Sequence, residues 1–329
     1  MRNPLDRPVV IGVGPVGRAV VAALHERGAR PVVVTRSLAG AHELHDDVEH
    51  RGADVSSPGG AQEALHDASA VFQCAQPPYH RWVHDFRPFQ DSILTGCERA
   101  DAPLVAVENL YGYGPVAAPM TESTPLITAN SPGATRKGAV RAEAWRDLER
   151  AHRDGRVACA AVRAADFVGP GVVQSVTGER FLTPLLAGKS AEVLGPLDVL
   201  HSLTAPTDVG RAMVAVACDE STWGRAWHAP TAPARTIGDV VGLAAAAAAD
   251  LGGPGSADTR RVPAILLRLV GLVNRDAGEV VEMLYQFDRD FVLDSTETES
   301  RLGLAPTSLE RSLRDALAWF AGRSATVRS

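Results

Sequence analysis

Lysine is almost missing from this chain of 329 residues: of its 33 basic residues, only Lys137 and Lys189 are lysines. We interpret this scarcity as a coding bias that favours arginine wherever any positive charge is sufficient. A lysine that persists in such a chain is a candidate for chemistry that arginine cannot supply. The basic residues form no clustered stripe and the net charge is −6. We therefore expect neither nucleic acid nor an anionic membrane as the main partner.

Cysteines, long apolar runs and an apolar leader are equally scarce. The four cysteines are far apart and mostly lie in apolar runs, which predicts buried free thiols of a cytoplasmic protein rather than disulfides or a metal site. They are Cys74, Cys97, Cys159 and Cys218. The longest apolar stretch, residues 240–251, is interrupted by Asp250 and is too short to span a bilayer. No charged and then apolar leader precedes Val9, so we expect no signal peptide.

Strand and helix patterns alternate through the first half of the chain. Short β-branched or apolar runs at 8–11, 31–34, 70–75, 103–107 and 157–162 predict strands, and 16–24, 61–68, 82–100 and 139–153 predict helices. This alternation predicts an α/β fold with a Rossmann-type, doubly wound parallel sheet. We assign residues 1–165 to this domain, with 206–230 returning to the sheet through a helix at 209–218 and a strand at 226–228.

Many glycines and prolines break the chain after residue 165 into short pieces. We predict a smaller, irregular C-terminal substrate-binding domain from residues 166–205 and 231–329. Its expected helices are 238–251, 264–273 and 308–320.

A glycine turn connects the first strand to the first helix. The segment runs Gly12-Val13-Gly14-Pro15-Val16-Gly17, between a buried strand and an amphipathic helix. In this setting Gly12 permits a tight turn, Gly14 lets a pyrophosphate approach the backbone, and Gly17 lets helix and strand pack closely. The free N–H groups at the helix start complete an anion site. The turn therefore predicts a dinucleotide site that includes Pro15 and Val16.

The end of the second strand indicates which dinucleotide is bound. An NAD site usually carries Asp or Glu about 20 residues after the glycines, to bind the ribose 2′-hydroxyl. Here the strand ends in Thr35-Arg36-Ser37, without a carboxylate. Because Arg36 offers a fork of donors suited to a 2′-phosphate and Ser37 adds a hydroxyl, we expect NADP (NADPH) as the cofactor.

An ordered set of motifs resembles the extended short-chain dehydrogenases/reductases, the NAD(P)-dependent epimerase/dehydratase family, over nearly the whole chain. The set comprises the glycine turn, Asp54-Val55, Leu110-Tyr111-Gly112, the segment from Arg163 to Gly171 and Thr207-Asp208-Val209. The resemblance implies that Asp54 and Val55 contact the adenine. It also implies that Cys74, Ala75 and Gln76 line the cofactor ribose, and that Asp208 starts the helix that returns to the sheet.

The chain departs from this family at the reacting groups. The resemblance implies a Tyr-x-x-x-Lys pair and a Ser or Thr, in which tyrosine transfers a proton and lysine lowers its pKa and holds the ribose. In register the lysine is Lys137, but the tyrosine position is Gly133 and the serine position is Val107. Two of the three catalytic residues are therefore missing.

Three explanations are open for the missing acid. Tyr113 or Tyr111, on the glycine-rich loop after the fifth strand, could supply the proton, with Tyr113 swinging over the nicotinamide. Alternatively, the substrate needs no strong acid, as in hydride transfer to a conjugated alkene or an iminium ion. In the third case the protein binds NADP(H) without redox turnover, as a sensor or a cyclase or lyase scaffold.

Further polar residues are candidates for substrate binding. Glu108 and Asn109 follow the fifth strand and could orient substrate or merely cap the loop. His201, with Asp198 three residues before it, is a second candidate, either as a general acid or in a surface loop.

Two other polar pairs have structural interpretations. We expect Asp166 and Arg163 to form a buried pair at the domain junction. His80 and His84 lack the glutamate and the third ligand of a zinc site, so no metal is predicted.

The function expected from these residues is an NADP(H)-dependent oxidoreductase. The second half is rich in leucine and lacks a Lys or Arg cluster for a diphosphate, which favours a small or medium, largely apolar carbonyl, enone or imine compound over a nucleotide sugar. The non-redox binding protein and an epimerase/dehydratase remain alternatives, and a homodimer is a further expectation.

Overall fold

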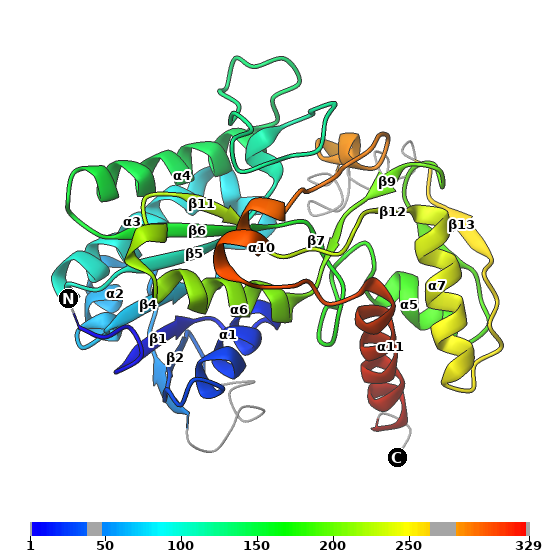
Figure 1. Ribbon diagram of the computed structural model, residues 1–329, viewed down its shortest axis with the longest axis horizontal. Coiled ribbons are helices and arrows are strands. Elements are labelled where there is room, and N and C mark those ends of the chain that lie inside the picture. The colour runs from blue at the N-terminus through cyan, green and yellow to red at the C-terminus, as the bar shows by residue number, and fades with distance from the viewer. Residues whose placement is uncertain (1, 38–47, 264–280, 327–329) are drawn as a thin grey trace.

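The computed structural model describes residues 2–37, 48–263 and 281–326 (Figure 1). Its centre is a seven-stranded sheet in the order β11-β6-β5-β4-β1-β2-β3, in which every neighbouring pair is parallel. The strands are β1 (Pro8–Ile11), β2 (Val32–Thr35), β3 (Glu49–Gly52), β4 (Ala70–Gln73), β5 (Leu104–Asn109), β6 (Cys159–Ala164) and β11 (Ala226–His228). This order confirms the predicted doubly wound parallel sheet.

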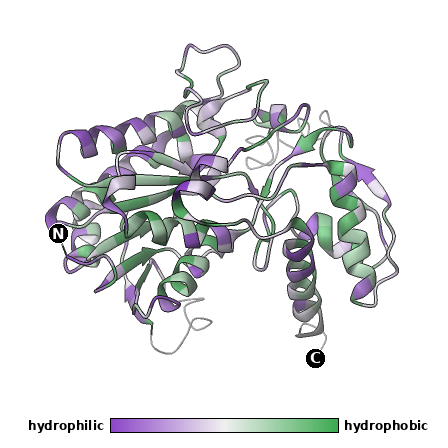
Figure 2. Cartoon of the chain, in the orientation of Figure 1, coloured by the Kyte–Doolittle hydropathy of each residue, from purple (hydrophilic) through white to green (hydrophobic). Residues whose placement is uncertain are grey.

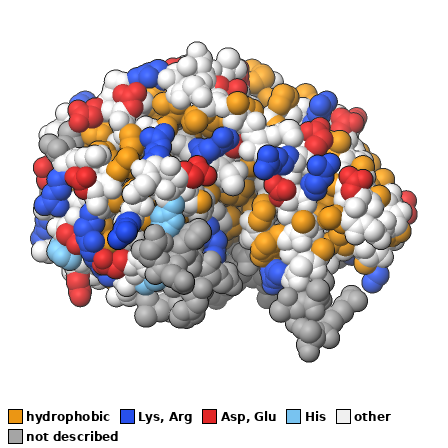
Figure 3. Space-filling view, turned by 60° about the horizontal axis from the view of Figure 1, so that its bottom comes forward, with side chains coloured by type: hydrophobic (Ala, Val, Ile, Leu, Met, Phe, Trp, Pro, Cys, Tyr) orange, Lys and Arg blue, Asp and Glu red, His pale blue; other side chains and the backbone are white. Residues whose placement is uncertain are grey.

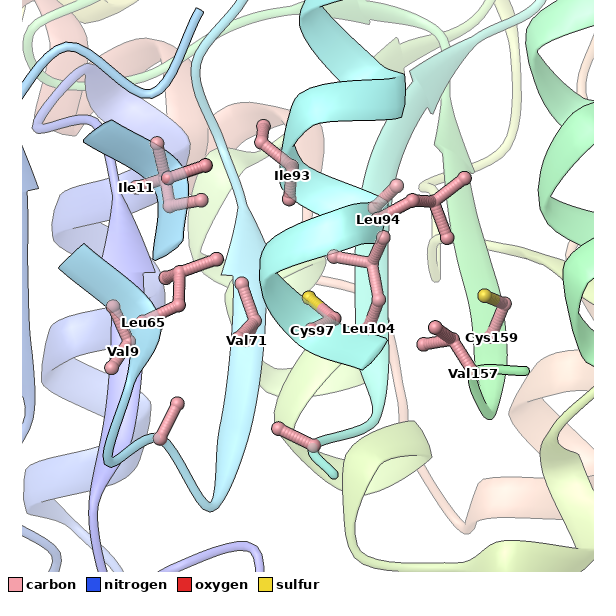
Figure 4. Packing of buried hydrophobic residues seen from close by; sticks show 14 of the residues in the cluster. Val9, Ile11, Leu65, Val71, Ile93, Leu94, Cys97, Leu104, Val157 and Cys159 are labelled. Carbon is pink, nitrogen blue, oxygen red and sulfur yellow. The ribbon is translucent and has the colours of Figure 1, made fainter. Parts of the chain in front are cut away.

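Helices cover both faces of the sheet because its strands are apolar on both sides. On one face α1 (Pro15–His25) and α6 (Pro206–Ala217) pack over Val10, Val33 and Phe72. On the other face α2 (Pro58–Leu65), α3 (Trp82–Ala100) and α4 (Arg136–Arg153) share a core with Val9 and Val71. Figure 4 shows this second core, with Ile93 and Cys97 of α3 packed beside Val71 and Leu104 of the sheet.

A second, smaller core lies beside the sheet. It is built from α5 (Glu179–Leu186), α7 (Ile237–Asp250) and α11 (Leu309–Thr326), together with the parallel pair β8 (Ala191–Val193) and β13 (Thr259–Arg261) (Figure 1). The helices predicted at 238–251 and 308–320 are present as α7 and α11 with shifted ends. The helix expected at 264–273 lies outside the described residues, and the exact domain boundaries stay a prediction.

Two short strand pairs connect the sheet to this second core. β7 (Asp166–Phe167) pairs with β10 (Leu203–Thr204), and β9 (Leu200–His201) pairs with β12 (Arg235–Thr236). Both pairs follow the carboxyl end of β6, where ligands bind in open parallel sheets. The connection therefore brings residues 166 and 201 to the functional edge of the sheet.

The surface is mixed in character. Figure 2 shows hydrophilic residues along much of α4 and hydrophobic ones in the sheet. On the face drawn in Figure 3, Lys and Arg side chains are interspersed with Asp and Glu. Across the described residues, no helix combines the length and apolarity needed to cross a membrane. Cys97 and Cys159 are buried as expected, whereas Cys218 is exposed, because it follows the last turn of α6.

Candidate functional site

The glycine turn lies at the centre of the sheet, between the ends of β1 and β4. Gly12 has a φ of 97°, and a Cβ there would lie 2.9 Å from the Cβ of Ala75. A Cβ on Gly17 would lie 2.0 Å from the carbonyl oxygen of Gly12. Both positions therefore exclude a side chain, because the turn, the helix and the neighbouring strand approach too closely.

Gly14 is different, because a Cβ built there meets nothing within 4 Å. The backbone of Gly14 thus borders open space directly before α1, which begins with Pro15 and has no acidic residue in its first turn. Unpaired N–H groups and the positive end of the helix dipole face this space. The observed arrangement fits a pyrophosphate, as predicted for a dinucleotide site.

The ends of β2 and β3 present the residues expected to select the cofactor. Arg36 and Ser37 are exposed, and the hydroxyl of Thr35 donates to the carbonyl of Ser37 at 2.7 Å. Hydrogen bonds from Ser56 and the charge of Arg36 lower the pKa of Asp54. The guanidinium of Arg36 is therefore exposed beside this edge of the sheet.

The other residues expected to line the cofactor lie at neighbouring strand ends. Val55 is buried next to the exposed Asp54. Cys74 and Ala75 are half-buried beside the glycine turn, and Gln76 is exposed. Burial raises the pKa of the Cys74 thiol, so this side chain stays protonated at neutral pH.

Lys137 lies in the first turn of α4 and is completely buried. Its Nζ donates to Glu282 Oε1 at 3.0 Å and lies 4.5 Å from the centroid of the Tyr79 ring. The other oxygen of Glu282 accepts the backbone N–H of Arg136 at 3.1 Å. The charge of Lys137 is therefore compensated by Glu282, and the lysine connects the start of α4 with residues that are distant in the sequence.

The positions of the missing family residues have a clear local structure. Gly133 precedes α4, which begins only at Arg136 with Thr135 as its N-cap. The φ of Gly133 is 71°, and a Cβ there would lie 2.7 Å from Pro115 Cγ. Residue 133 is thus outside the helix that carries Lys137, so no side chain at this position could share a helix face with the lysine.

Tyr113 lies in the core of the protein. It is 1% exposed, and its hydroxyl accepts a hydrogen bond from Arg163 Nη1 at 2.9 Å and lies 2.7 Å from His228 Nε2. The Nδ1 of His228 in turn lies 2.7 Å from the carbonyl of Asp294. These hydrogen bonds hold the hydroxyl in the core and do not favour a swing over a nicotinamide, so catalysis by Tyr113 stays an untested prediction.

Tyr111, two residues earlier, lies on the side of Lys137. It is half-buried, and its ring centroid lies 6.2 Å from that of Trp82. Burial and the charge of Asp166 raise the pKa of Tyr111 to about 12. The same two causes, with Tyr111 itself, raise the pKa of Tyr79. The tyrosine beside Lys137 is therefore Tyr79, and Tyr111 belongs to the same aromatic cluster.

Glu108 and Asn109 take structural positions at the end of β5. Glu108 is 5% exposed and accepts a hydrogen bond from Arg163 Nε at 3.0 Å. Asn109 accepts the backbone N–H of Tyr111 and so caps the loop. Arg141 fills the space beside Glu108 and donates to the carbonyl of Val107 at 3.2 Å. Of the two alternatives for this pair, the geometry favours the loop cap for Asn109.

Asp166 and His201 form a pair that the sequence analysis did not identify. The Nε2 of His201 lies 2.8 Å from Asp166 Oδ2. The expected pair of Asp166 and Arg163 is not formed, because Arg163 pairs with Glu108. His201 is 1% exposed and its ring stacks between Phe287 and Phe291. It is therefore no surface-loop residue, and Asp198 is not its partner.

Three site residues were missed because nothing in the sequence connects them with the glycine turn. Tyr79, Glu282 and Gln286 come from the loop after β4 and from the segment before and within η5 (Leu284–Gln286). A polar residue within an irregular segment carries no periodic signal, and Glu282 is 145 residues away from its partner Lys137. Within the described ranges, no group of three or more His, Cys, Asp or Glu is arranged to hold a metal ion.

Comparisons with known proteins agree with this architecture. Residues 9–225 match the model of the NAD dependent epimerase/dehydratase family. No curated protein matches the chain significantly.

Among solved structures, an epimerase from Methanothermobacter thermautotrophicus is similar at 15% identity and a TM-score of 0.78, covering 99% of this chain and 95% of that one. A UDP-glucose 4-epimerase from Thermotoga maritima (17% identity, TM-score 0.75, 97% and 99%) and a nucleoside-diphosphate-sugar epimerase from Pseudomonas aeruginosa (17%, 0.73, 97% and 98%) are also similar. At these identities the likeness shows the fold.

Proposed function

Because this chain belongs to the NAD dependent epimerase/dehydratase family, we propose that it is an NADP(H)-dependent oxidoreductase acting on a small or medium, largely apolar carbonyl, enone or imine compound. The observation that carries the cofactor preference is the exposed Arg36, at the end of the strand next to the glycine turn. Its planar fork of donors suits a 2′-phosphate, and no carboxylate follows in the motif Thr35-Arg36-Ser37.

The cofactor would be held by groups that the fold already positions. The backbone at Gly14 and the start of α1 would bind the pyrophosphate, and Arg36 with Ser37 the 2′-phosphate. Lys137 would bind the nicotinamide ribose, in competition with its present partner Glu282. When bound, the cofactor supplies or accepts a hydride; the protein supplies orientation and exclusion of water.

The chain's own residues limit the proton chemistry. Position 133 offers no hydroxyl, position 107 is a valine, and the Tyr113 hydroxyl is buried in a separate hydrogen-bonded chain. Tyr111 is the remaining tyrosine candidate, but a pKa raised to about 12 makes it a weak acid near neutral pH. These features favour substrates whose reduction needs little help from an acid.

The non-redox alternative rests on the same missing residues. A panel of aldehydes, ketones, enones and imines, incubated with the protein and NADPH, separates the two functions by the loss of absorbance of NADPH. We expect consumption with at least one class in the wild type, whereas Gly14→Ala, which obstructs the open space before α1, should need about tenfold more NADPH for the same rate. No consumption with any compound, in spite of measured NADPH binding, would favour a sensor or a non-redox scaffold.

A further inference from the structure

The carboxylate of Asp166 has no cationic partner among the described side chains. Within residues 2–37, 48–263 and 281–326, His201 is the only ion-pairing group within 4.0 Å of the carboxylate, with its Nε2 at 2.8 Å. The Asp166 side chain is 23% exposed, whereas that of His201 is 0% exposed. A partly exposed carboxylate without Lys or Arg at the functional edge of a sheet is available to a ligand.

His201 is fixed as a hydrogen-bond donor to this carboxylate. Its Nδ1 is buried and, within the described part of the chain, makes no hydrogen bond. Phe287 and Phe291 cover the two faces of the ring at 5.3 and 5.5 Å between centroids. The ring therefore orients the Asp166 carboxylate through Nε2.

The aromatic stack at His201 continues to Tyr285, whose ring centroid lies 6.3 Å from that of Phe291. After burial, the charge of Asp166 contributes to the raised pKa of Tyr79, Tyr111 and Tyr285, so all three hydroxyls lie within its field. The hydroxyl of Tyr285 and the Oε1 of Gln286 are buried and lack partners among the described residues. Gln286 is only 3% exposed and directly follows Tyr285 in η5. Buried polar atoms that lack protein partners point to a bound ligand.

The cations close to the site are already occupied. Lys137 is paired with Glu282, Arg163 and Arg141 both lie within ion-pair distance of Glu108, and all three cations are at most 4% exposed. Arg289 is exposed, and its charge partly opposes the rise in the pKa of Tyr285. It lies beyond ion-pair distance of Asp166. The ligand-facing charge is thus negative and is bordered by tyrosine rings, an environment that attracts cations.

We infer that the substrate is a cationic nitrogen compound, an iminium ion, whose N–H binds the Asp166 carboxylate. This inference rests on the proposed function and names its substrate class. Transfer of a hydride to the iminium carbon moves the C=N π pair to nitrogen, gives a neutral amine and oxidises NADPH to NADP⁺. The step needs no acid, since the nitrogen already carries its proton. This substrate class therefore explains why the chain has no tyrosine at position 133 and no serine at position 107. His201 is then a positioning residue.

Equilibrium binding tests this inference without turnover. The probes are tetrahydroisoquinoline, a cation at neutral pH, and isochroman, the neutral ether of the same shape, titrated against the NADP⁺-loaded full chain by intrinsic fluorescence. We expect the cation to bind at least about tenfold more tightly, a difference of ~1.4 kcal/mol. Asp166→Asn, which keeps an acceptor for His201, should remove this preference.

The matched control is Asp198→Asn, which removes an exposed carboxylate that is close in sequence to His201 but is not its partner. This variant should keep the preference. His201→Phe, which preserves the ring stack, should reduce the preference without loss of NADP⁺ binding. Equal affinities for the two probes in the wild type, or a preference that survives in Asp166→Asn, would overturn the inference. Failure of NADP⁺ itself to bind would overturn the proposed function.

Discussion

Lys137 and Glu282 are 145 residues apart in the chain, yet the Nζ of the lysine donates to the carboxylate at 3.0 Å. The contact joins the first turn of α4 to a segment that follows residue 280, and Tyr79 covers the ammonium group with its ring. It compensates a charge that is completely buried. A cofactor ribose bound by Lys137 would share this lysine with Glu282, so the C-terminal segment belongs to the site.

Gly14→Ala should fold normally and bind NADPH poorly. A Cβ at this position meets no protein atom within 4 Å, and the backbone is extended, with a φ of −65°. The methyl group would instead occupy the space for the pyrophosphate, and we expect a loss of about tenfold in affinity, ~1.4 kcal/mol. Gly59→Ala, another glycine whose added Cβ meets nothing, is the control. An unchanged Kd for NADPH, measured by calorimetry, would contradict the pyrophosphate site.

Lys137→Arg should weaken NADPH binding several-fold or more, although it keeps the positive charge. The planar guanidinium is larger than an ammonium group and would have to fit a completely buried position under the ring of Tyr79. Lys189→Arg, at the other, exposed lysine of the chain, should bind NADPH like the wild type. Equal affinities of both variants would argue against a role of Lys137 at the ribose.

Tyr113→Phe should destabilise the protein without affecting cofactor binding. Removal of the hydroxyl takes the partner from two buried nitrogens, Arg163 Nη1 and His228 Nε2, which costs about 1–3 kcal/mol. Urea denaturation measures this loss, and NADPH titration of the folded variant should match the wild type. A variant with wild-type stability but a large loss of turnover would restore Tyr113 as the acid.

His228 should make the protein less stable in mild acid. Burial lowers its pKa from the ordinary value of 6.5, so the unfolded chain takes up a proton that the folded protein does not. The free energy of unfolding therefore has its full value above the ordinary pKa of 6.5 and decreases as the pH falls below it. His228→Gln should reduce the decrease in Tm between about pH 7 and about pH 5, whereas His66→Gln, at an exposed histidine, should leave it unchanged.

The sequence predicted the sheet because each of its signals is local. The β-branched run at 8–11, the glycines at 12, 14 and 17 and the helix that follows lie within one continuous segment, and their order alone implies parallel strands. The lysine was predicted from a motif with fixed spacing. The hydrogen bonds of Tyr113 were not predicted. Tyr111 and Tyr113 are only two residues apart, and the sequence does not show which of the two side chains is buried in the core.

The partners of the site residues could not be predicted for a different reason. Asp166 meets His201 because β7 pairs with β10, which begins two residues after His201 in the chain. Arg163 pairs with Glu108 because the two residues are opposite each other in the register of β6 and β5. The sequence alone gives neither the pairing of these strands nor their register. The cofactor end of the site is therefore more predictable than the substrate end.

The most direct test of the account is the titration of NADPH and NADH against the wild type and Arg36→Ala. We predict that the wild type binds NADPH at least about tenfold more tightly than NADH, ~1.4 kcal/mol, and that Arg36→Ala removes this difference by weakening NADPH alone. Arg30→Ala, an exposed arginine before the other end of β2, is the control and should keep the preference. Equal affinities for the two cofactors in the wild type, unchanged by Arg36→Ala, would contradict the account.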